Sequence, residues 1–237
     1  MRPIRHLTPR YAYNRLRWKT FHWRHPDVPY LNQEIIAILD ALLRPDDAGL
    51  EWGAGASTAW FAARCGRLVS VEHDAGWAGR VRRSLERQGL ADKVDLRLCE
   101  WSRDAGMPAA YMDIAREIAD CSLDFVLVDG RKRDICALLA LSKVKPGGLL
   151  VVDDVHRYLP RERPSPAPHA RGPKDGCTSA KWGQFKGVVD DWRCIWRTDG
   201  VSDTALWIKP SARRAWSAQS DAASESLSLQ RIGHDVA

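Results

Sequence analysis

The 237-residue sequence lacks several features that would assign it to a special class of protein. No run approaches the roughly 20 apolar residues that cross a bilayer, and the N-terminus lacks the apolar segment of a secretory signal. The six cysteines form no C-x-x-C pair and no regular spacing, so a zinc site is not expected. We therefore expect a cytoplasmic protein. Since 45% of its residues are hydrophobic, the chain can bury one substantial core.

Acidic residues are missing from the first 26 positions, which hold seven basic residues of a chain whose formal net charge is +6. The other 211 residues therefore carry −1. Five aromatic residues accompany the basic ones in this N-terminal arm (residues 1–29): Tyr11, Tyr13, Trp18, Phe21 and Trp23. Such a mixture suits nucleic acid, an anionic membrane face or a polyanionic substrate. Alternatively, the aromatic side chains pack on the domain while the arginines face water, which is the interpretation we favour.

A glycine is also missing from a turn that otherwise resembles a nucleotide-binding loop. Glu51-Trp-Gly-Ala-Gly-Ala-Ser57 follows a short apolar run, 48–50, and opens a helix predicted over 57–63. Dinucleotide-binding turns carry a third glycine three residues after the second, where this chain has Thr58. Glu51, two residues before the first glycine, would repel a phosphate. It would attract a cationic ligand with an amino group, and S-adenosylmethionine (SAM) is one.

A second carboxylate supports this cofactor. The predicted strand 68–72 ends in Glu72, 17 residues after Gly55, where a carboxylate can accept hydrogen bonds from both ribose hydroxyls. Glu51, Gly53, Gly55, Ser57 and Glu72 resemble the cofactor half of a class I SAM-dependent methyltransferase. The resemblance implies that SAM is bound by these residues, with further contacts from Glu100, Trp101 and Asp129. An ordinary glycine turn with a solvated Glu72 is the alternative.

Helices and strands alternate along the rest of the chain. Further helices are predicted over 32–43, 73–88, 104–120, 133–144 and 179–191, and further strands over 94–98, 124–128, 149–152, 193–197 and 204–208, with a turn over 145–148. The pattern predicts an α/β fold, Rossmann-like and doubly wound. Its sheet has seven mostly parallel strands and ends in an antiparallel hairpin. We expect the methyltransferase domain over 30–211 and a mobile tail over 212–237, which is rich in Ser, Ala and charge.

Carboxylates follow five predicted strands, at the edge of the sheet where such folds bind ligands. They are Glu51, Glu72, Glu100, Asp129, Asp153 and Asp154. The strand order of a methyltransferase would bring the last three together. Carboxylates that share a site repel one another unless they are protonated or neutralised. A divalent cation such as Mg²⁺, which prefers oxygen ligands, is a common solution.

The residues around these carboxylates resemble a narrower family. Val128-Asp129-Gly130 and the segment 145–154, KPGGLLVVDD, are similar to the metal-dependent small-molecule O-methyltransferases of the catechol, caffeoyl-CoA and macrocin types. The resemblance spans about residues 30–209 and implies that Asp129, Asp153 and Asp154 hold Mg²⁺. Without a metal, Asp129 would instead hold the substrate or the methionine amino group, and Asp154 would cap a turn.

Two residues compete for the role of general base. In the catechol type a lysine three residues after the first metal ligand is the base, and Lys132 occupies that place. The macrocin type has an acid two residues after that ligand, and Arg131 departs from it. His156 is the rival base, because an unperturbed imidazole titrates near neutral pH. Lys132 as a solvated helix residue and His156 as a structural one are the alternatives, and Asp129 is also a candidate catalytic residue.

The resemblance implies methyl transfer to a hydroxyl of a small molecule or saccharide. The segment 159–180 holds five prolines and four basic residues, and its place after Asp154 predicts a loop over the active site that suits an anionic acceptor. Tyr30 would close the cofactor side, and the alternative is that it is part of the core. Two other function classes stay open: an enzyme with another nucleotide cofactor, and a polyanion- or membrane-binding protein on a methyltransferase scaffold. No pattern in the sequence sets an oligomeric state.

Overall fold

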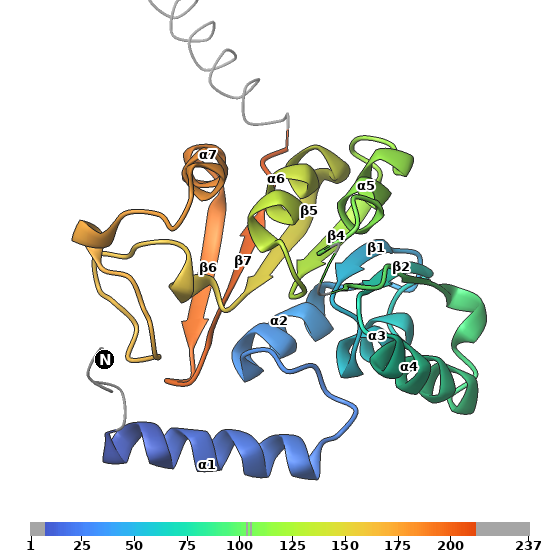
Figure 1. Cartoon of the computed structure of the whole chain (residues 1–237), viewed down its shortest axis with the longest axis horizontal. Coiled ribbons are helices and arrows are strands. Elements are labelled where there is room, and N and C mark those ends of the chain that lie inside the picture. Colours follow the sequence, from blue (N-terminus) through green and yellow to red (C-terminus); the bar gives the residue numbers. More distant parts are fainter. Residues whose placement is uncertain (1–7, 103, 105, 212–237) are drawn as a thin grey trace, which may run out of the picture.

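A computed structural model describes residues 8–102, 104 and 106–211 (Figure 1). The first seven residues of the arm and the predicted tail over 212–237 lie outside this part of the chain. The strands are β1 (Ala48–Trp52), β2 (Arg67–Glu72), β3 (Val94–Leu98), β4 (Leu123–Val128), β5 (Val144–Asp153), β6 (Arg193–Thr198) and β7 (Asp203–Ile208). The α-helices are α1 (Pro9–Arg24), α2 (Gln33–Leu42), α3 (Ala56–Ala62), α4 (Ala75–Arg87), α5 (Ala110–Glu117), α6 (Arg133–Lys143) and α7 (Ala180–Val189).

The seven strands form one sheet in the order β3-β2-β1-β4-β5-β7-β6. The first five strands pair in parallel, and β7 pairs antiparallel with both β5 and β6. The predicted Rossmann-like sheet with its C-terminal antiparallel hairpin is therefore confirmed. The strand order reverses between β1 and β4, and at such a switch point the loops after the two strands diverge and leave a crevice for a ligand.

Helices cover both faces of the sheet (Figure 1). The apolar side chains of α5, α6 and α7 pack on one face, around the fully buried Trp52 and Phe185. Those of α2 and α3 pack on the other face, where Phe61 stacks on Phe125 with ring centroids 4.8 Å apart. The strands β4 and β5 are buried on both faces, as their continuous apolar runs predict. This double layer holds the ends of β1 and β4 rigidly in place.

Two elements differ from the sequence prediction. The helix expected over 104–120, with an interruption near Pro108, is only Ala110–Glu117, because the described part of the segment before Pro108 forms no helix and Ser102 pairs with Gly106 in an isolated bridge. The turn expected over 145–148 lies instead within β5, which begins at Val144. The pairing of β4 with β5 shifts register between Leu123 and Phe125, and this irregularity accommodates Pro146 and the two glycines that follow it.

The N-terminal arm contains a helix that the sequence analysis did not predict. Thr8 caps α1, since its side-chain oxygen accepts a hydrogen bond from Tyr11 N at 3.1 Å, and Pro9 occupies the first helical position. Trp18 packs toward the domain on Tyr30, with ring centroids 5.7 Å apart. Tyr13 and Trp23 are 65% and 80% exposed, so the prediction that the aromatic residues of the arm pack on the domain holds only in part.

Candidate active site

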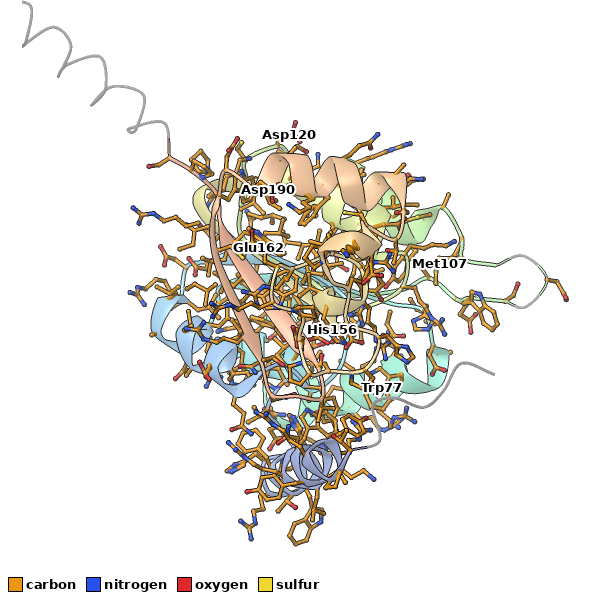
Figure 2. All side chains as sticks on the ribbon, turned by 90° about the vertical axis from the view of Figure 1, so that its left-hand side faces the viewer. Trp77, Met107, Asp120, His156, Glu162 and Asp190 are labelled. Carbon is orange, nitrogen blue, oxygen red and sulfur yellow. The ribbon has the colours of Figure 1, made fainter. Side chains whose placement is uncertain are left out.

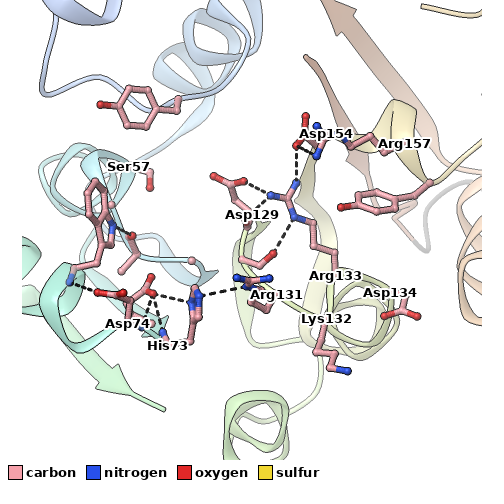
Figure 3. Close-up of a pocket in the computed structure, with 18 of the residues that line it drawn as sticks. Ser57, His73, Asp74, Asp129, Arg131, Lys132, Arg133, Asp134, Asp154 and Arg157 are labelled. Atoms are coloured by element: carbon pink, nitrogen blue, oxygen red, sulfur yellow. Dashed lines mark hydrogen bonds and ion pairs between the residues drawn. The ribbon is translucent and has the colours of Figure 1, made fainter. Parts of the chain in front are cut away.

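A cavity of about 900 Å³ opens beyond the carboxyl ends of β1, β2, β4 and β5 (Figure 3). Its walls come from the glycine turn 53–57, the start of α4, the β4–α6 loop with the first residues of α6 (129–134), and the segment that ends in α7. A cavity of this size falls within the range of small-molecule and cofactor sites. Gly53, Gly55, Ser57, Glu72, Asp129, Lys132 and Asp154 line it, which brings together most of the site residues predicted from the sequence.

Glu51 lies beneath this cavity and does not line it. Its side chain is fully buried and accepts hydrogen bonds from the hydroxyls of Ser57, Thr58 (2.6 Å) and Ser70 (2.7 Å). Burial raises the pKa of Glu51 to about 7. The carboxylate thus ties the start of α3 to β1 and β2 and acts as a positioning residue for the glycine turn.

Thr58 occupies the place of the third glycine of a dinucleotide site, and its side chain forms a hydrogen bond within the turn. Gly55 N donates to Thr58 Oγ1 at 2.9 Å, so this amide is not available to a phosphate. Thr58 Oγ1 in turn donates to Glu51, which puts a carboxylate where a pyrophosphate would need positive charge. The turn therefore fits a cationic cofactor better than a dinucleotide.

Glu72, at the end of β2, offers one free carboxylate oxygen to the cavity. Its Oε1 accepts from the backbone N–H groups of His73 and Asp74, both at 2.8 Å. The ring of His73 bridges Glu72 and Arg131, with Nδ1 2.7 Å from Glu72 Oε1 and Nε2 accepting from Arg131 Nε at 3.3 Å. No described residue donates to Glu72 Oε2. This oxygen fits the predicted role of accepting from ribose hydroxyls.

The side chain of Trp77 forms the wall beside the glycine turn. Its Nε1 donates to Ala54 O, and Arg80 lies over its ring at 4.2 Å. Both residues lie on α4 and line the cavity. Neither residue was among those predicted from the sequence, although their spacing of three residues on a helix that starts at the strand end places them on one face.

The turns after β1 and β4 touch each other, and this contact fixes the direction of Asp129. Gly53 has a φ of +99°, and a Cβ atom there would lie 2.7 Å from Gly130 N. A Cβ atom on Gly130 would overlap the hydroxyl of Tyr111. Asp129 N donates to Trp52 O at 2.9 Å. Glycine is therefore required on both sides of the contact if the two turns are to meet at the cavity floor.

Asp129, Asp153 and Asp154 do come together, but around a guanidinium group. Arg133 Nη2 lies 2.8 Å from Asp129 Oδ1 (Figure 3), and Nη1 lies 3.9 Å from both Asp153 Oδ2 and Asp154 Oδ2. Arg133 also donates to the backbone carbonyls of Gly130, Asp129 and Asp153. Its side chain is only 14% exposed. The positive charge that the three carboxylates require is therefore supplied by the protein itself.

This arrangement does not fit the Mg²⁺ site predicted from the resemblance. A cation held by the three carboxylates would need the space that the Arg133 guanidinium fills, and two like charges would then share it. Asp153 and Asp154 also have other partners, with Thr204 Oγ1 donating to Asp153 at 2.7 Å and Ser202 Oγ to Asp154 at 2.8 Å. Within the described part of the chain, no group of three or more His, Cys, Asp or Glu side chains is arranged to hold a metal ion.

Burial shifts the two innermost carboxyl groups toward their protonated forms. The pKa of Asp129 rises to about 6, because burial outweighs the opposing effect of the Arg133 charge. The pKa of Asp153 rises well above its usual value, first through burial and then through the neighbouring charge of Asp129. Asp129 lines the cavity, whereas Asp153 lies behind it. A carboxylate with a pKa near 6 is a better proton acceptor than an ordinary one.

The two bases predicted from the sequence differ in placement. His156 is 2% exposed and lies in the interior of the molecule (Figure 2), outside the cavity. Its Nδ1 accepts from Asp203 N, and Nε2 lies 3.1 Å from Pro168 O, so both ring nitrogens have partners and do not fit the role of a base. Lys132 lines the cavity, but its side chain extends away from Asp129 and Arg133 (Figure 3).

The wall of the cavity formed by Tyr158 and Trp182 has features suited to binding the methyl acceptor. Tyr158 and Trp182 stack with ring centroids 5.0 Å apart and an interplanar angle of 12°, and both line the cavity. Arg157, 46% exposed, lies 3.3 Å from Asp154 at the same wall. Of the proline-rich segment 159–180, only Thr178 and Ser179 line the cavity. The basic residues around the cavity are therefore Arg80, Arg131, Lys132, Arg133 and Arg157, and none comes from the predicted loop.

Three remaining predictions concern the rim. Tyr30 lines the cavity as expected and carries the contact with α1. Glu100 and Trp101 are exposed and do not line the cavity, so their predicted contact with the adenine stays a prediction. Trp101 N does donate to His73 O at 3.1 Å, which keeps the end of β3 next to the end of β2.

Part of the chain that contains this site matches a known family model. Residues 50–155 match the model of a family described as a methyltransferase domain. An O-methyltransferase from Bacillus cereus, solved in complex with SAH, has a similar structure with a TM-score of 0.54 and 16% identity, over 85% of this chain and 91% of that one. TomG, an O-methyltransferase from Streptomyces achromogenes solved with SAM, gives 0.51 and 20%, over 85% and 90%. No curated protein matches the chain in sequence.

A putative O-methyltransferase from Klebsiella pneumoniae is similar to the same extent, with a TM-score of 0.51 and 21% identity over 85% of this chain and 90% of that one. At such identities the structures share the fold with this chain, and the family match over residues 50–155 covers the glycine turn, Glu72, Asp129 and the acidic pair. The methyltransferase-domain match and the shared fold agree with the class I SAM-dependent methyltransferase that the glycine turn and Glu72 predict.

Proposed function

We propose that the protein transfers the methyl group of SAM to a hydroxyl of a small molecule or saccharide that carries an anionic group, without a metal ion bound by Asp129, Asp153 and Asp154. The observation that carries the proposal is the composition of one cavity. It combines a cradle for SAM, made by the glycine turn and Glu72, with a wall of stacked aromatic rings and basic side chains.

In this reaction the protein need not form a covalent bond with SAM or with the acceptor. The acceptor oxygen attacks the methyl carbon of SAM, the carbon–sulfur bond breaks, and the sulfonium becomes the neutral thioether of S-adenosylhomocysteine. The proton of the acceptor hydroxyl must then go to a base. Positioning the oxygen in line with the methyl group supplies much of the rate acceleration.

We assign the base to Asp129. Its carboxylate lines the cavity, is held in place by Arg133 at 2.8 Å, and has a pKa raised to about 6 by burial. Proton transfer to a positioned side chain typically contributes about 10²–10⁴-fold to the rate. Arg131, Lys132 and Arg157 lie at the rim, where they would hold a carboxylate or phosphate of the acceptor.

The test uses tritiated SAM and a panel of phenols and sugars, each offered in a neutral and an anionic form, with EDTA or with Mg²⁺. We expect labelling of an anionic acceptor at the same rate in both conditions. Labelling that requires Mg²⁺, or that favours the neutral members, would contradict the proposal. Asp129→Asn should lower kcat and keep SAM affinity, whereas Asp113→Asn, on the surface of α5, should change neither.

A further inference from the structure

The helix α1 carries an exposed apolar ridge that no part of the described chain covers. Tyr13, Leu16 and Trp23 are 65%, 65% and 80% exposed. They follow one another at spacings of three and seven residues, which places them on one side of a helix. Figure 2 shows α1 at the lower edge of the molecule, with its side chains extending away from the domain.

The opposite side of α1 is the one that holds the helix to the domain. His22 is buried and packs on Tyr30, with ring centroids 4.7 Å apart, and Trp18 packs on Tyr30 beside it. Asn14 lies against Gly200 in the β6–β7 hairpin. These contacts fix the rotation of the helix about its axis. The apolar ridge therefore faces away from the domain.

Basic residues border this ridge. Arg10, Arg17 and Arg24 recur every seven residues along one edge of it and are exposed, and Lys19 lies on the other edge. The helix contains no acidic residue. None of these four side chains forms an ion pair with an acidic residue among the positions that the structure describes. A hollow of about 370 Å³, which extends to Gln33 at the start of α2, is lined by both kinds of residue, Tyr13 and Leu16 with Arg17 and Arg24.

We propose that α1 docks the protein onto the surface of an anionic lipid bilayer. Apolar side chains enter the boundary between headgroups and acyl chains while the flanking arginines bind the anionic headgroups. Tyrosine and tryptophan favour that boundary, because one end of each ring system is polar. Leu16 favours lipid over nucleic acid, because it has neither a ring to stack on a base nor a group to bind a phosphate. In the described part of the chain no helix is long and apolar enough to span a bilayer.

The position of α1 relates this docking surface to the cavity. Helix α1 lies on the side of the domain to which the carboxyl ends of the parallel strands point (Figure 1). Tyr30 touches the inner side of α1 and also lines the cavity. A bilayer bound to the outer side of α1 would therefore lie on the same side of the domain as the catalytic centre.

Co-sedimentation of the full chain with vesicles tests the proposal. Phosphatidylcholine vesicles with phosphatidylglycerol should bind the protein, vesicles of phosphatidylcholine alone should not, and binding should fall steeply with salt. Arg10→Ala/Arg17→Ala/Arg24→Ala should weaken binding by roughly a hundredfold. The matched control Arg82→Ala/Arg83→Ala/Arg87→Ala removes three exposed charges from α4 and should leave binding unchanged.

A second pair of variants tests the apolar ridge. Leu16→Ala/Trp23→Ala should weaken vesicle binding by about tenfold or more, since each lost methylene group lowers the affinity for lipid. Leu42→Ala/Val188→Ala, which truncates side chains of 42% and 45% exposure elsewhere, should not. Thermal melting confirms that each variant is folded. Equal losses in variants and controls, equal binding to both kinds of vesicle, or tighter binding to single-stranded DNA than to anionic vesicles would overturn the proposal.

Discussion

Arg133 Nη2 lies 2.8 Å from Asp129 Oδ1, and this ion pair occupies the place where the sequence resemblance predicts a divalent cation. The two residues are four positions apart on the β4–α6 loop and the first turn of α6, so one short segment supplies both charges. Arg133 also reaches Asp153 and Asp154 at the end of β5. A guanidinium thus joins the two strand ends that border the cavity.

Removal of this guanidinium should destabilise the protein. Arg133→Met keeps most of the side-chain volume but leaves Asp129 and Asp153 without a positive partner in a buried site, whereas Asp154 keeps Arg157. Breaking a buried ion pair costs about 3–5 kcal/mol, so we expect a loss of this order in the free energy of unfolding by urea. Arg116→Ala, which removes a 77% exposed partner of Asp113, should cost less than about 1 kcal/mol. A loss for Arg133→Met as small as that of the control would contradict the account.

Glu72→Gln tests the cofactor cradle. The amide oxygen of Gln still accepts from the backbone of His73 and Asp74, but the free oxygen that faces the cavity becomes an NH₂ group, which cannot accept from ribose. Hydrogen bonds to charged groups contribute about 1.5–3 kcal/mol, so SAM should bind roughly ten- to a hundredfold more weakly by calorimetry. The control Glu86→Gln, exposed on α4, should bind SAM normally. Unchanged affinity in Glu72→Gln would remove Glu72 from the site.

Gly53→Ala should damage both the fold and the cofactor site. A Cβ atom at this position combines a φ of +99° with a distance of 2.7 Å to Gly130 N, so the turns after β1 and β4 must separate. Gly89→Ala is the matched control, because Gly89 has a φ of +66° but nothing within 4 Å of its Cβ position. We expect the control to cost about 1 kcal/mol through backbone strain alone. Gly53→Ala should cost more and also weaken SAM binding, and equal losses of stability would argue against the contact.

The fold and the cofactor side were predictable from local patterns, for physical reasons. Apolar runs such as 124–128 read as buried parallel strands, and the Gly-x-Gly turn with Glu72 depends only on short sequence spacings. Helix α1 was not predicted because few apolar residues mark it, although Thr8 before Pro9 is a signal for the start of a helix. The register shift in β5 depends on pairing with β4, which no local pattern encodes.

The acceptor side was less predictable because its properties arise from tertiary contacts. Arg133 looks in the sequence like a solvated residue among Arg131 and Lys132, and only the packing of α6 against the end of β5 makes it a partner of three carboxylates. His156 follows the acidic pair in sequence, yet the short helix Val155–Arg157 turns its ring into the interior. Neither outcome can be derived from spacing.

The stability of the protein should depend on pH through Glu51. Its pKa is about 7 in the folded protein against an ordinary value of 4.5, so the folded state binds more protons than the unfolded state between these values. Stability conferred by the protonated form is complete below about pH 4.5 and is lost as the pH rises toward 7. Glu51→Gln lacks this titration. As the pH rises from 5 to 8, the free energy of unfolding of the wild type should therefore fall relative to that of Glu51→Gln, by up to about 1.4 kcal/mol per pH unit. Parallel curves from pH 5 to 8 would contradict the assignment.

The most direct test of the account is calorimetric titration of the full chain with SAM in the presence of EDTA, with NAD as the comparison ligand. The account predicts saturable binding of SAM at micromolar concentrations and no binding of NAD, because Thr58 and Glu51 close the turn to a pyrophosphate while Glu72 faces the cavity. Absence of heat with SAM, or binding of NAD in its place, would contradict the central claim that this cavity is the cofactor site of a methyltransferase.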